Sequence, residues 1–191
     1  MKKVILIDAS PREGANCSMA VDFIAENIKD AEVEIFRLRE KKLGPCLACN
    51  ECKKLDKAAC VQQDDLGDLV KRIDEMDGIV VAAPIYFGMV NAPAKALLDR
   101  LYCFFAPAKE VPTLSTKLDK KAALVLAAGS GPADVYAVHG EAYIGGFSVV
   151  GAKETKVLSF NGGNLPGEIW KKEENLAQLK ELSDWLLKDA E

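Results

Sequence analysis

The feature that most constrains the fold is a regular alternation of short apolar runs with longer segments of helical spacing. The runs are rich in β-branched residues, as is typical of strands in a parallel sheet; they are Lys3–Asp8, Glu32–Leu38, Gly78–Ala83, Lys121–Ala127 and Lys153–Ser159. The segments with helical spacing are Cys17–Ile28, Asp65–Met76, Ala92–Phe104, Ala133–Phe147 and Lys171–Leu187. Parallel neighbours need crossovers of helical length, and right-handed crossovers place helices on both faces. We therefore predict an α/β fold with a doubly wound, five-stranded parallel sheet.

Length and composition limit the chain to one globular body. Chains divide into several domains only when they are considerably longer than 191 residues, and no repeat or linker divides this one. We therefore expect residues 1–191 to form one domain. Hydrophobic residues make up 49% and charged residues 28%, which excludes a disordered chain or a coiled coil. The net charge of -4 provides no basic excess for a nucleic acid, so no such partner is expected.

The apolar stretches predict a cytoplasmic protein without a membrane span. The apolar run near the N-terminus is too short for a signal-peptide core. The most apolar stretch, Ile79–Val90, is interrupted by Pro84 and Gly88 and is shorter than a membrane helix. In a reducing compartment the six cysteines are expected to serve as metal ligands or reactive thiols rather than as a disulfide framework.

The segment Ser10–Ser18 joins the first predicted strand to the first helix and is built mainly of small residues. Ligands of doubly wound folds bind beyond the carboxyl ends of the strands. Backbone N–H groups, two hydroxyls and the Arg12 guanidinium at a helix N-terminus suit a phosphate monoester. The alternative is that Asn16 caps the helix and Arg12 is solvated. The segment lacks the pattern of a P-loop, the three glycines of a dinucleotide fingerprint, and the Cys-before-Arg order of a low-molecular-weight tyrosine phosphatase.

Four cysteines are crowded into a short stretch with the spacing C-x2-C-x2-C-x7-C; they are Cys46, Cys49, Cys52 and Cys60. Three cysteines at successive spacings of three, followed by one on a longer arm, favour an iron-sulfur cluster, which needs four thiolates. Structural zinc sites more often use two separated pairs. Zinc, or buried cysteines without any metal, remain open alternatives.

Three spaced motifs together resemble one family. Ser10-Pro11-Arg12 with Asn16-Cys17 is similar to the phosphate loop of the flavodoxin-like NAD(P)H-dependent FMN reductases, and Ala83–Gly88 is similar to their flavin-ring loop. The stretch Ala94–Arg100 continues the pattern, and the cysteine run before Asp64-Asp65 resembles the iron-sulfur flavoproteins within that superfamily. The resemblance covers roughly the first 130 residues.

The resemblance implies a flavodoxin-like fold with strand order 2-1-3-4-5 and an FMN-binding domain that carries a cysteine-rich loop at about residues 42–64. It implies an FMN phosphate held by Ser10, Arg12, Asn16, Cys17 and Ser18. It places the isoalloxazine against Pro84, Ile85, Tyr86, Phe87 and Gly88, an apolar and aromatic turn that can wall a flavin ring. Gly129 and Ser130 follow the fourth predicted strand, where glycine permits a close approach to the ring. A 4Fe-4S cluster is implied at the four cysteines.

The function implied is an FMN-dependent electron-transfer oxidoreductase. Electrons would pass between NAD(P)H or a ferredoxin-like donor, FMN and the cluster, with no catalytic side chain, because the flavin carries the chemistry. One alternative is a clusterless NAD(P)H-dependent flavin or quinone reductase, and another is a non-enzymatic flavodoxin-like electron carrier. The donor and the acceptor are not set by the sequence.

A homodimer or homotetramer is also implied, in which one subunit's cysteine loop approaches the flavin of its neighbour. We expect the cysteine loop beyond the carboxyl edge of the sheet, where a monomer would shield a cluster poorly. Segments that offer apolar contact surface are Tyr102–Pro107, Tyr136, Tyr143 and Phe147, with core packing as the alternative for each.

Overall fold

The computed structural model describes residues 1–106 and 112–190, and Pro107 of the expected contact segment lies outside them. Five parallel strands form one sheet in the order β2-β1-β3-β5-β6, with a short strand β4 paired antiparallel to β3. The bounds are Lys2–Asp8 for β1, Ala31–Arg37 for β2, Gly78–Tyr86 for β3, Met89–Val90 for β4, Lys120–Ala127 for β5 and Ala152–Phe160 for β6.

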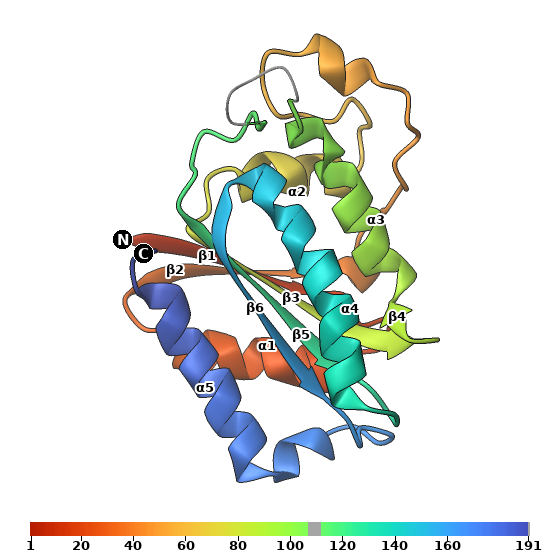
Figure 1. Cartoon of the computed structure of the whole chain (residues 1–191), viewed down its shortest axis with the longest axis vertical. Coiled ribbons are helices and arrows are strands. Elements are labelled where there is room, and N and C mark those ends of the chain that lie inside the picture. Colours follow the sequence, from red (N-terminus) through yellow and green to blue (C-terminus); the bar gives the residue numbers. More distant parts are fainter. Residues whose placement is uncertain (107–111, 191) are drawn as a thin grey trace.

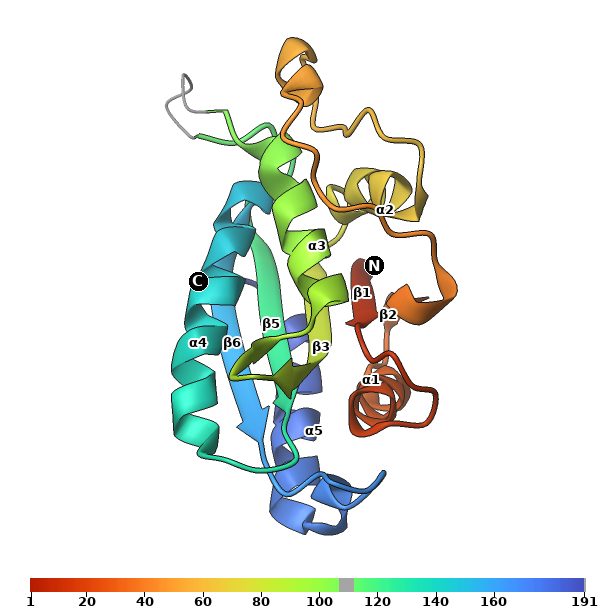
Figure 2. The same cartoon turned by 90° about the vertical axis from the view of Figure 1, so that its right-hand side faces the viewer.

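Helices cover both faces of the sheet (Figures 1 and 2). The helices α1 (Asn16–Asn27) and α5 (Glu173–Leu187) pack on one face. The opposite face carries α2 (Asp65–Ile73), α3 (Ala92–Arg100) and α4 (Ala133–Gly145). Short 3-10 turns complete the helical elements; they are η1 (Leu38–Glu40), η2 (Glu51–Lys54), η3 (Leu101–Phe104), η4 (Gly146–Val150) and η5 (Ile169–Lys171).

The central strands are buried because both of their faces pack against helices. Val4 and Leu6 of β1 belong to the core under α1 and α5, whereas Ile5 and Ile7 belong to the core under α2, α3 and α4. Successive side chains of a strand point to opposite faces, so a strand between two helical layers must be apolar throughout. This two-sided burial explains why the apolar runs predicted the strands.

The predicted sheet of five strands in the order 2-1-3-4-5 is wrong in one respect, because the structure has six strands and the order 2-1-3-5-6. The additional strand β4 pairs Ile85 with Val90 and Tyr86 with Met89. The sequence interpretation ended the third strand at Ala83 and treated the following residues as a loop. A two-residue strand is too short to give a periodic signal, so the hairpin escaped notice.

Three predicted helices end earlier than expected by more than one residue, and α2 stops at Ile73 rather than Met76. The segment Ala92–Phe104 divides into α3 and the 3-10 turn η3, and Ala133–Phe147 divides into α4 and η4. Among the described residues, no helix has the length and apolarity that crossing a membrane requires.

Candidate functional site

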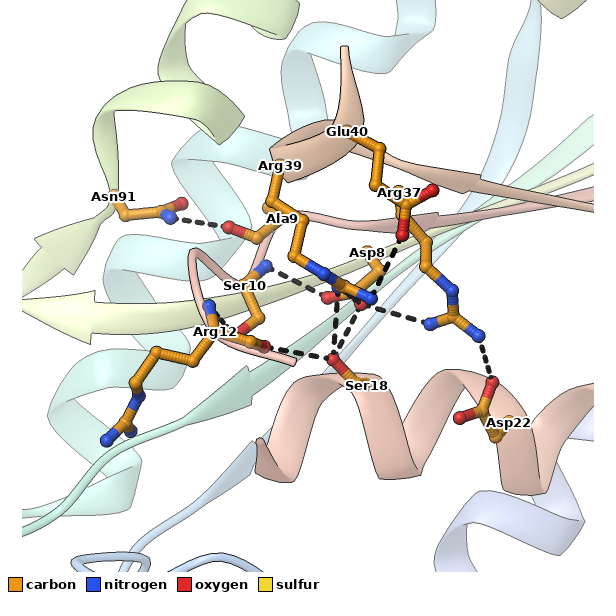
Figure 3. A network of polar contacts seen from close by, with 10 residues as sticks. All are labelled: Asp8, Ala9, Ser10, Arg12, Ser18, Asp22, Arg37, Arg39, Glu40 and Asn91. Atoms are coloured by element: carbon orange, nitrogen blue, oxygen red, sulfur yellow. Dashed lines mark hydrogen bonds and ion pairs between the residues drawn. The ribbon is translucent and has the colours of Figure 1, made fainter. Parts of the chain in front are cut away.

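A buried polar network lies beneath the loop that follows β1 (Figure 3). The Asp8 side chain is fully buried, and its carboxylate accepts hydrogen bonds from the Ser10 backbone N–H at 2.9 Å and the Ser18 hydroxyl at 2.7 Å. It also forms ion pairs with Arg39 at 2.6 Å and Arg37 at 3.2 Å. A buried carboxylate needs such partners, because its desolvation would otherwise cost several kcal/mol. The network therefore fixes the start of the loop to the first turn of α1.

Sequence reasoning missed Asp8, Arg37 and Arg39. Arg37 lies opposite Asp8 in the parallel register of β1 and β2, and Arg39 follows in η1. Arg37 also reaches Asp22 of α1 at 2.6 Å. The signal that could have revealed the network is an acidic residue at the end of one predicted strand and two arginines at the end of its neighbour.

The loop itself leaves backbone donors and one guanidinium open to the cleft. The Ser10 hydroxyl donates to the Arg12 carbonyl at 3.0 Å and accepts from the Arg12 N–H at 3.2 Å, so it shapes the turn. The Arg12 side chain points away from the Asp8 network and is exposed (Figure 3). The first turn of α1 contains no acidic residue, so its free N–H groups present an uncompensated positive end. This geometry suits an anion.

Asn16 does not cap α1; the N-cap is Ala15, with no side-chain cap hydrogen bond. The Asn16 amide instead donates to the carbonyls of Gly163 at 3.1 Å and Leu165 at 3.2 Å and accepts from the Gly167 N–H at 2.8 Å. Its backbone carbonyl accepts from the Trp170 indole at 3.0 Å. Asn16 therefore joins the first loop to the segment that follows β6.

Cys17 is buried beside Asn16, and burial raises the pKa of its thiol far above the usual range. A neutral thiol is a poor nucleophile, so Cys17 can contribute only packing and its backbone N–H to the loop.

A cleft brings together most of the residues predicted to bind the flavin. Its lining includes eight of them: Ser10, Arg12, Asn16, Cys17, Pro84, Ile85, Tyr86 and Gly129. The sequence interpretation missed the other four lining residues: Ala15, Ala127, Gly163 and Asn164. Gly163 and Asn164 follow β6, where the Asn-Gly-Gly-Asn sequence at 161–164 is a turn signal. The remaining predicted residues, Ser18, Phe87, Gly88 and Ser130, do not line this cleft.

The predicted flavin-ring loop is a tight β-hairpin rather than an irregular loop. Phe87 and Gly88 form its turn with φ values of 51° and 79°, as a two-residue hairpin of the favoured twist requires. A phenylalanine rarely adopts a left-handed backbone, and this one is fully exposed. The exposed Phe87 and half-exposed Tyr86 thus form an aromatic rim at the end of β3.

The four cysteines of the run line a second, separate pocket, together with Arg100, Tyr102 and Cys103. Ala48 and Asn50 have left-handed φ values of 50° and 58°, which curl the chain between the cysteines. Lys53 attaches this loop to η3, since its ammonium donates to the Tyr102 carbonyl and to the Phe105 carbonyl, the latter at 2.8 Å, and stands 3.7 Å from the Tyr102 ring centroid. Burial raises the pKa of Cys52, and the nearby Lys53 ammonium offsets part of that rise.

The two ends of the cysteine loop are held together by a buried ion pair. Arg100 donates to both Asp64 oxygens, at 2.7 and 2.8 Å, and to the Gly44 carbonyl at 2.9 Å. Asp64 also accepts from the N–H groups of Gly44 and Gly67, both at 2.9 Å. Hydrogen bonding to Arg100 lowers the pKa of Asp64 to about 2. Burial alone would lower the pKa of Arg100, but Asp64 and Cys60 raise it, so the guanidinium stays charged.

The side chains that line this pocket suit an iron-sulfur cluster better than a single metal ion. In the described residues, no group of three or more Cys, His, Asp or Glu side chains converges closely enough for a single metal ion. A 4Fe-4S cluster makes a different demand, because each thiolate binds a different iron. The Arg100 Nε is buried and has no hydrogen-bond partner in the described part of the chain, and Arg100 belongs to the lining of this pocket. A pocket with four thiols and a spare cationic donor fits an anionic cluster.

Cys103 is a core residue of η3, although it touches the same pocket. Burial raises the pKa of its thiol to about 12. Tyr143 and Phe147, expected as contact surface, are also buried in the core, which corrects that expectation.

The sequence interpretation expected the cysteine loop beyond the carboxyl edge of the sheet. In the structure the cysteine pocket lies elsewhere. The loop leaves β2 and runs along α3 to the far end of that helix (Figures 1 and 2). Asn91 at the start of α3 donates to Ala9 at 2.6 Å beside the first loop, whereas Arg100 at its end lines the cysteine pocket. The nine residues of α3 span about 14 Å between these two contacts.

A doubly wound parallel sheet with an anion-ready first loop and an aromatic rim at the end of β3 defines a protein of the flavodoxin-like class. The chain belongs to the NADPH-dependent FMN reductase family, whose model matches residues 2–143.

Similar proteins include iron-sulfur flavoproteins from archaea. The chain is 40% identical over 102 residues to one from Methanocaldococcus jannaschii and 36% identical over 100 residues to one from Methanosarcina thermophila; each match covers 51% of both chains. It thus spans about half the length of these relatives. It is 29% identical to one from Archaeoglobus fulgidus over 87% of this chain and 71% of the relative.

Solved structures share the fold at low identity. The NAD(P)H:quinone oxidoreductase from Methanothermobacter marburgensis superposes with a TM-score of 0.73 and 18% identity, over 97% of this chain and 96% of the other. An FMN-dependent NADH-azoreductase from Bacillus anthracis, in complex with FMN, superposes with a TM-score of 0.69 and 13% identity, over 98% of this chain and 100% of the other.

Proposed function

We propose that this chain is an FMN-dependent oxidoreductase of the iron-sulfur flavoprotein type, which passes electrons between NAD(P)H or a ferredoxin-like donor, FMN and a 4Fe-4S cluster. The observation that carries the proposal is the presence of an anion-ready loop and a four-cysteine pocket on one chain of the FMN reductase family. The names of the archaeal relatives support it. Four free thiolates require a reducing compartment, so the proposal includes a cytoplasmic location.

The first loop would bind the FMN phosphate through Arg12 and the N–H groups at the start of α1. The hydroxyls of Ser10 and Ser18 already bond within the protein, so their part is to hold the loop in shape. Asn16 closes the cleft by joining the loop to residues 163–167. Pro84, Ile85 and Tyr86 would wall one side of the flavin ring, with Gly129 approaching closely from β5.

Cys46, Cys49, Cys52 and Cys60 would hold the cluster. When bound, FMN supplies two-electron chemistry and the cluster accepts electrons one at a time. The lysine beside Tyr102 and the Arg100–Asp64 pair hold the loop in place. Arg100 also places a positive charge beside the cluster, which offsets part of its negative charge.

We also propose a homodimer or homotetramer in which transfer runs between subunits. The flavin cleft and the cysteine pocket share no lining residue within one chain, which supports a route from one subunit's flavin to its neighbour's cluster. Exposed apolar side chains on the hairpin and α4 offer contact surface; the largest exposures are those of Phe87, Val138, Met89 and Tyr86. Sedimentation at micromolar concentration should show at least a dimer, and a stable monomer with full transfer would contradict this assembly.

One anaerobic preparation tests the main proposal. The absorption spectrum should contain flavin and cluster bands, with four irons and four sulfides per chain, as a 4Fe-4S cluster requires. NADH or NADPH should bleach the flavin. Flavin without iron or sulfide would instead indicate a clusterless reductase. A flavin that neither nicotinamide reduces would indicate a carrier fed by a protein donor.

A further inference from the structure

Arg100 has one donor that the fold does not use. The side chain is fully buried at the end of α3, and both terminal nitrogens donate to Asp64 or Gly44. The Nε–H is buried and has no partner among the described residues. Leaving a buried donor unpaired is unfavourable, and more so when the group is charged. A fold that retains such a donor implies an acceptor that moves into place when a ligand binds.

The pocket that Arg100 lines contains sulfur acceptors. Cys60 lines the same pocket as Arg100, and its sulfur is an acceptor that the hydrogen bonds of the Arg100 guanidinium to Asp64 and Gly44 leave unused. Cys60 is the ligand on the longer arm of the cysteine run, just before the Asp64 that anchors Arg100. The ion pair therefore holds the guanidinium in the pocket that also contains the Cys60 sulfur, the ligand whose position the spacing constrains least.

We propose that Arg100 is a positioning residue that donates its Nε–H to the Cys60 sulfur when the cluster is bound, fixes Cys60 as the fourth ligand and raises the reduction potential of the cluster. This inference rests on the proposed function. Reduction adds negative charge to the cluster, and a cationic hydrogen-bond donor at a ligating sulfur stabilises that charge.

A substitution of Asp64 tests the inference through the direction in which the reduction potential of the cluster shifts. Arg100 and Asp64 form one ion pair, so replacing either residue opens the same contact between the ends of the loop. Their charges act on the cluster in opposite directions, however. Arg100→Gln removes a positive charge and should lower the reduction potential, whereas Asp64→Asn removes a negative charge and should raise it. A purely structural role would shift both variants in the same direction.

The experiment is a redox titration of the anaerobically purified full-length holoprotein, followed by the electron paramagnetic resonance signal of the reduced cluster. Iron and sulfide per chain are measured on each sample. We expect Arg100→Gln to shift the midpoint downward by at least tenfold in the redox equilibrium, which is about 59 mV for one electron. Asp64→Asn should shift it upward. Arg72→Gln is the matched control, since Arg72 pairs with Glu34 away from the pocket, and its midpoint should equal that of the wild type.

Arg100→Lys keeps the charge and the pairing with Asp64 but lacks the Nε–H. Its loaded cluster should have a midpoint below that of the wild type, and its Fe–S(Cys) stretching bands in resonance Raman spectra should shift. An unchanged midpoint in loaded Arg100→Gln or Arg100→Lys would overturn the inference, as would shifts of one sign in Arg100→Gln and Asp64→Asn.

Failure to load iron is also decisive. Loss of iron in both Arg100 variants, with retention in Asp64→Asn, would support a direct role at Cys60. Loss of iron in all three variants would show that Arg100 only holds the ends of the loop together, and it would overturn the inference. Wild-type protein without iron or sulfide would instead refute the cluster in the proposed function.

Discussion

The first loop and the cysteine loop follow neighbouring strands, but they are built in opposite ways. The first loop is short and is fixed from below by the fully buried Asp8 with two arginines and a serine. The cysteine loop is much longer, contains one 3-10 turn and is tied mainly at its ends, by Arg100 with Asp64 and by Lys53. The comparison teaches that the phosphate site is preorganised by the fold, whereas the cysteine site gains its final geometry from what binds there.

The largest expected effect is the separation of the two sites by Cys49→Ala. This variant should lose all cluster iron, because a 4Fe-4S cluster needs four thiolates, while it binds FMN as the wild type does. Iron and sulfide analysis with a flavin titration measures both. Cys17→Ala is the matched control for iron and should keep it, since Cys17 lies outside the cysteine pocket. Full iron in Cys49→Ala would contradict the ligand assignment.

Asp8→Asn should disrupt the buried network that preorganises the first loop. Removing one partner of a buried ion pair leaves the others uncompensated, so the free energy of unfolding should fall by about 3–5 kcal/mol. Denaturant unfolding of the flavin-free protein measures it, with Asp22→Asn as the control, because that carboxylate is half exposed and forms its ion pair with Arg37. Equal losses in the two variants would show that burial of Asp8 adds nothing.

Arg12→Ala should weaken FMN binding by about 1.5–3 kcal/mol, the worth of one hydrogen bond to a charged group. Riboflavin, which lacks the phosphate, should bind as tightly as it binds the wild type. Adding Ser10→Ala should increase the loss by disturbing the turn around Arg12. Titrations of both flavins against both proteins, and against Glu13→Ala as an exposed neighbour, decide the matter. An equal loss for the two flavins would place Arg12 away from the phosphate.

Acid should weaken the ion pair of Asp64 with Arg100, which holds the two ends of the cysteine loop together. The pKa of Asp64 is about 2 in the folded protein, below its ordinary value of 3.8, so its stabilisation is complete above pH 3.8 and is lost as the pH falls through 2. Wild type should exceed Asp64→Asn by about 2 kcal/mol at pH 5, and the two should converge near pH 2. Urea unfolding of the iron-free proteins measures this. A constant difference over that pH range would contradict the assigned role.

The sequence predicted the strands and the first loop well, because both depend on local patterns. β1 is apolar on both faces, and the loop after it follows directly from where the strand ends. The sequence did not reveal the pairing of Asp8 with Arg37 and Arg39, which depends on the register between two strands. It also misplaced the cysteine loop, because the path of a long loop is set by distant contacts such as that of Arg100 with Asp64.

The contacts of Asn16 set the order in which the flavin cleft can be completed. The amide of Asn16 bonds to Gly167, 151 residues further along the chain, and its carbonyl accepts from Trp170. Contacts of such sequence separation close large loops and form late in folding. During synthesis, which proceeds from the N-terminus, α1 and its loop emerge long before these partners. A nascent chain therefore presents an incomplete cleft until residues 163–170 have left the ribosome, so flavin capture follows their release rather than that of the first loop.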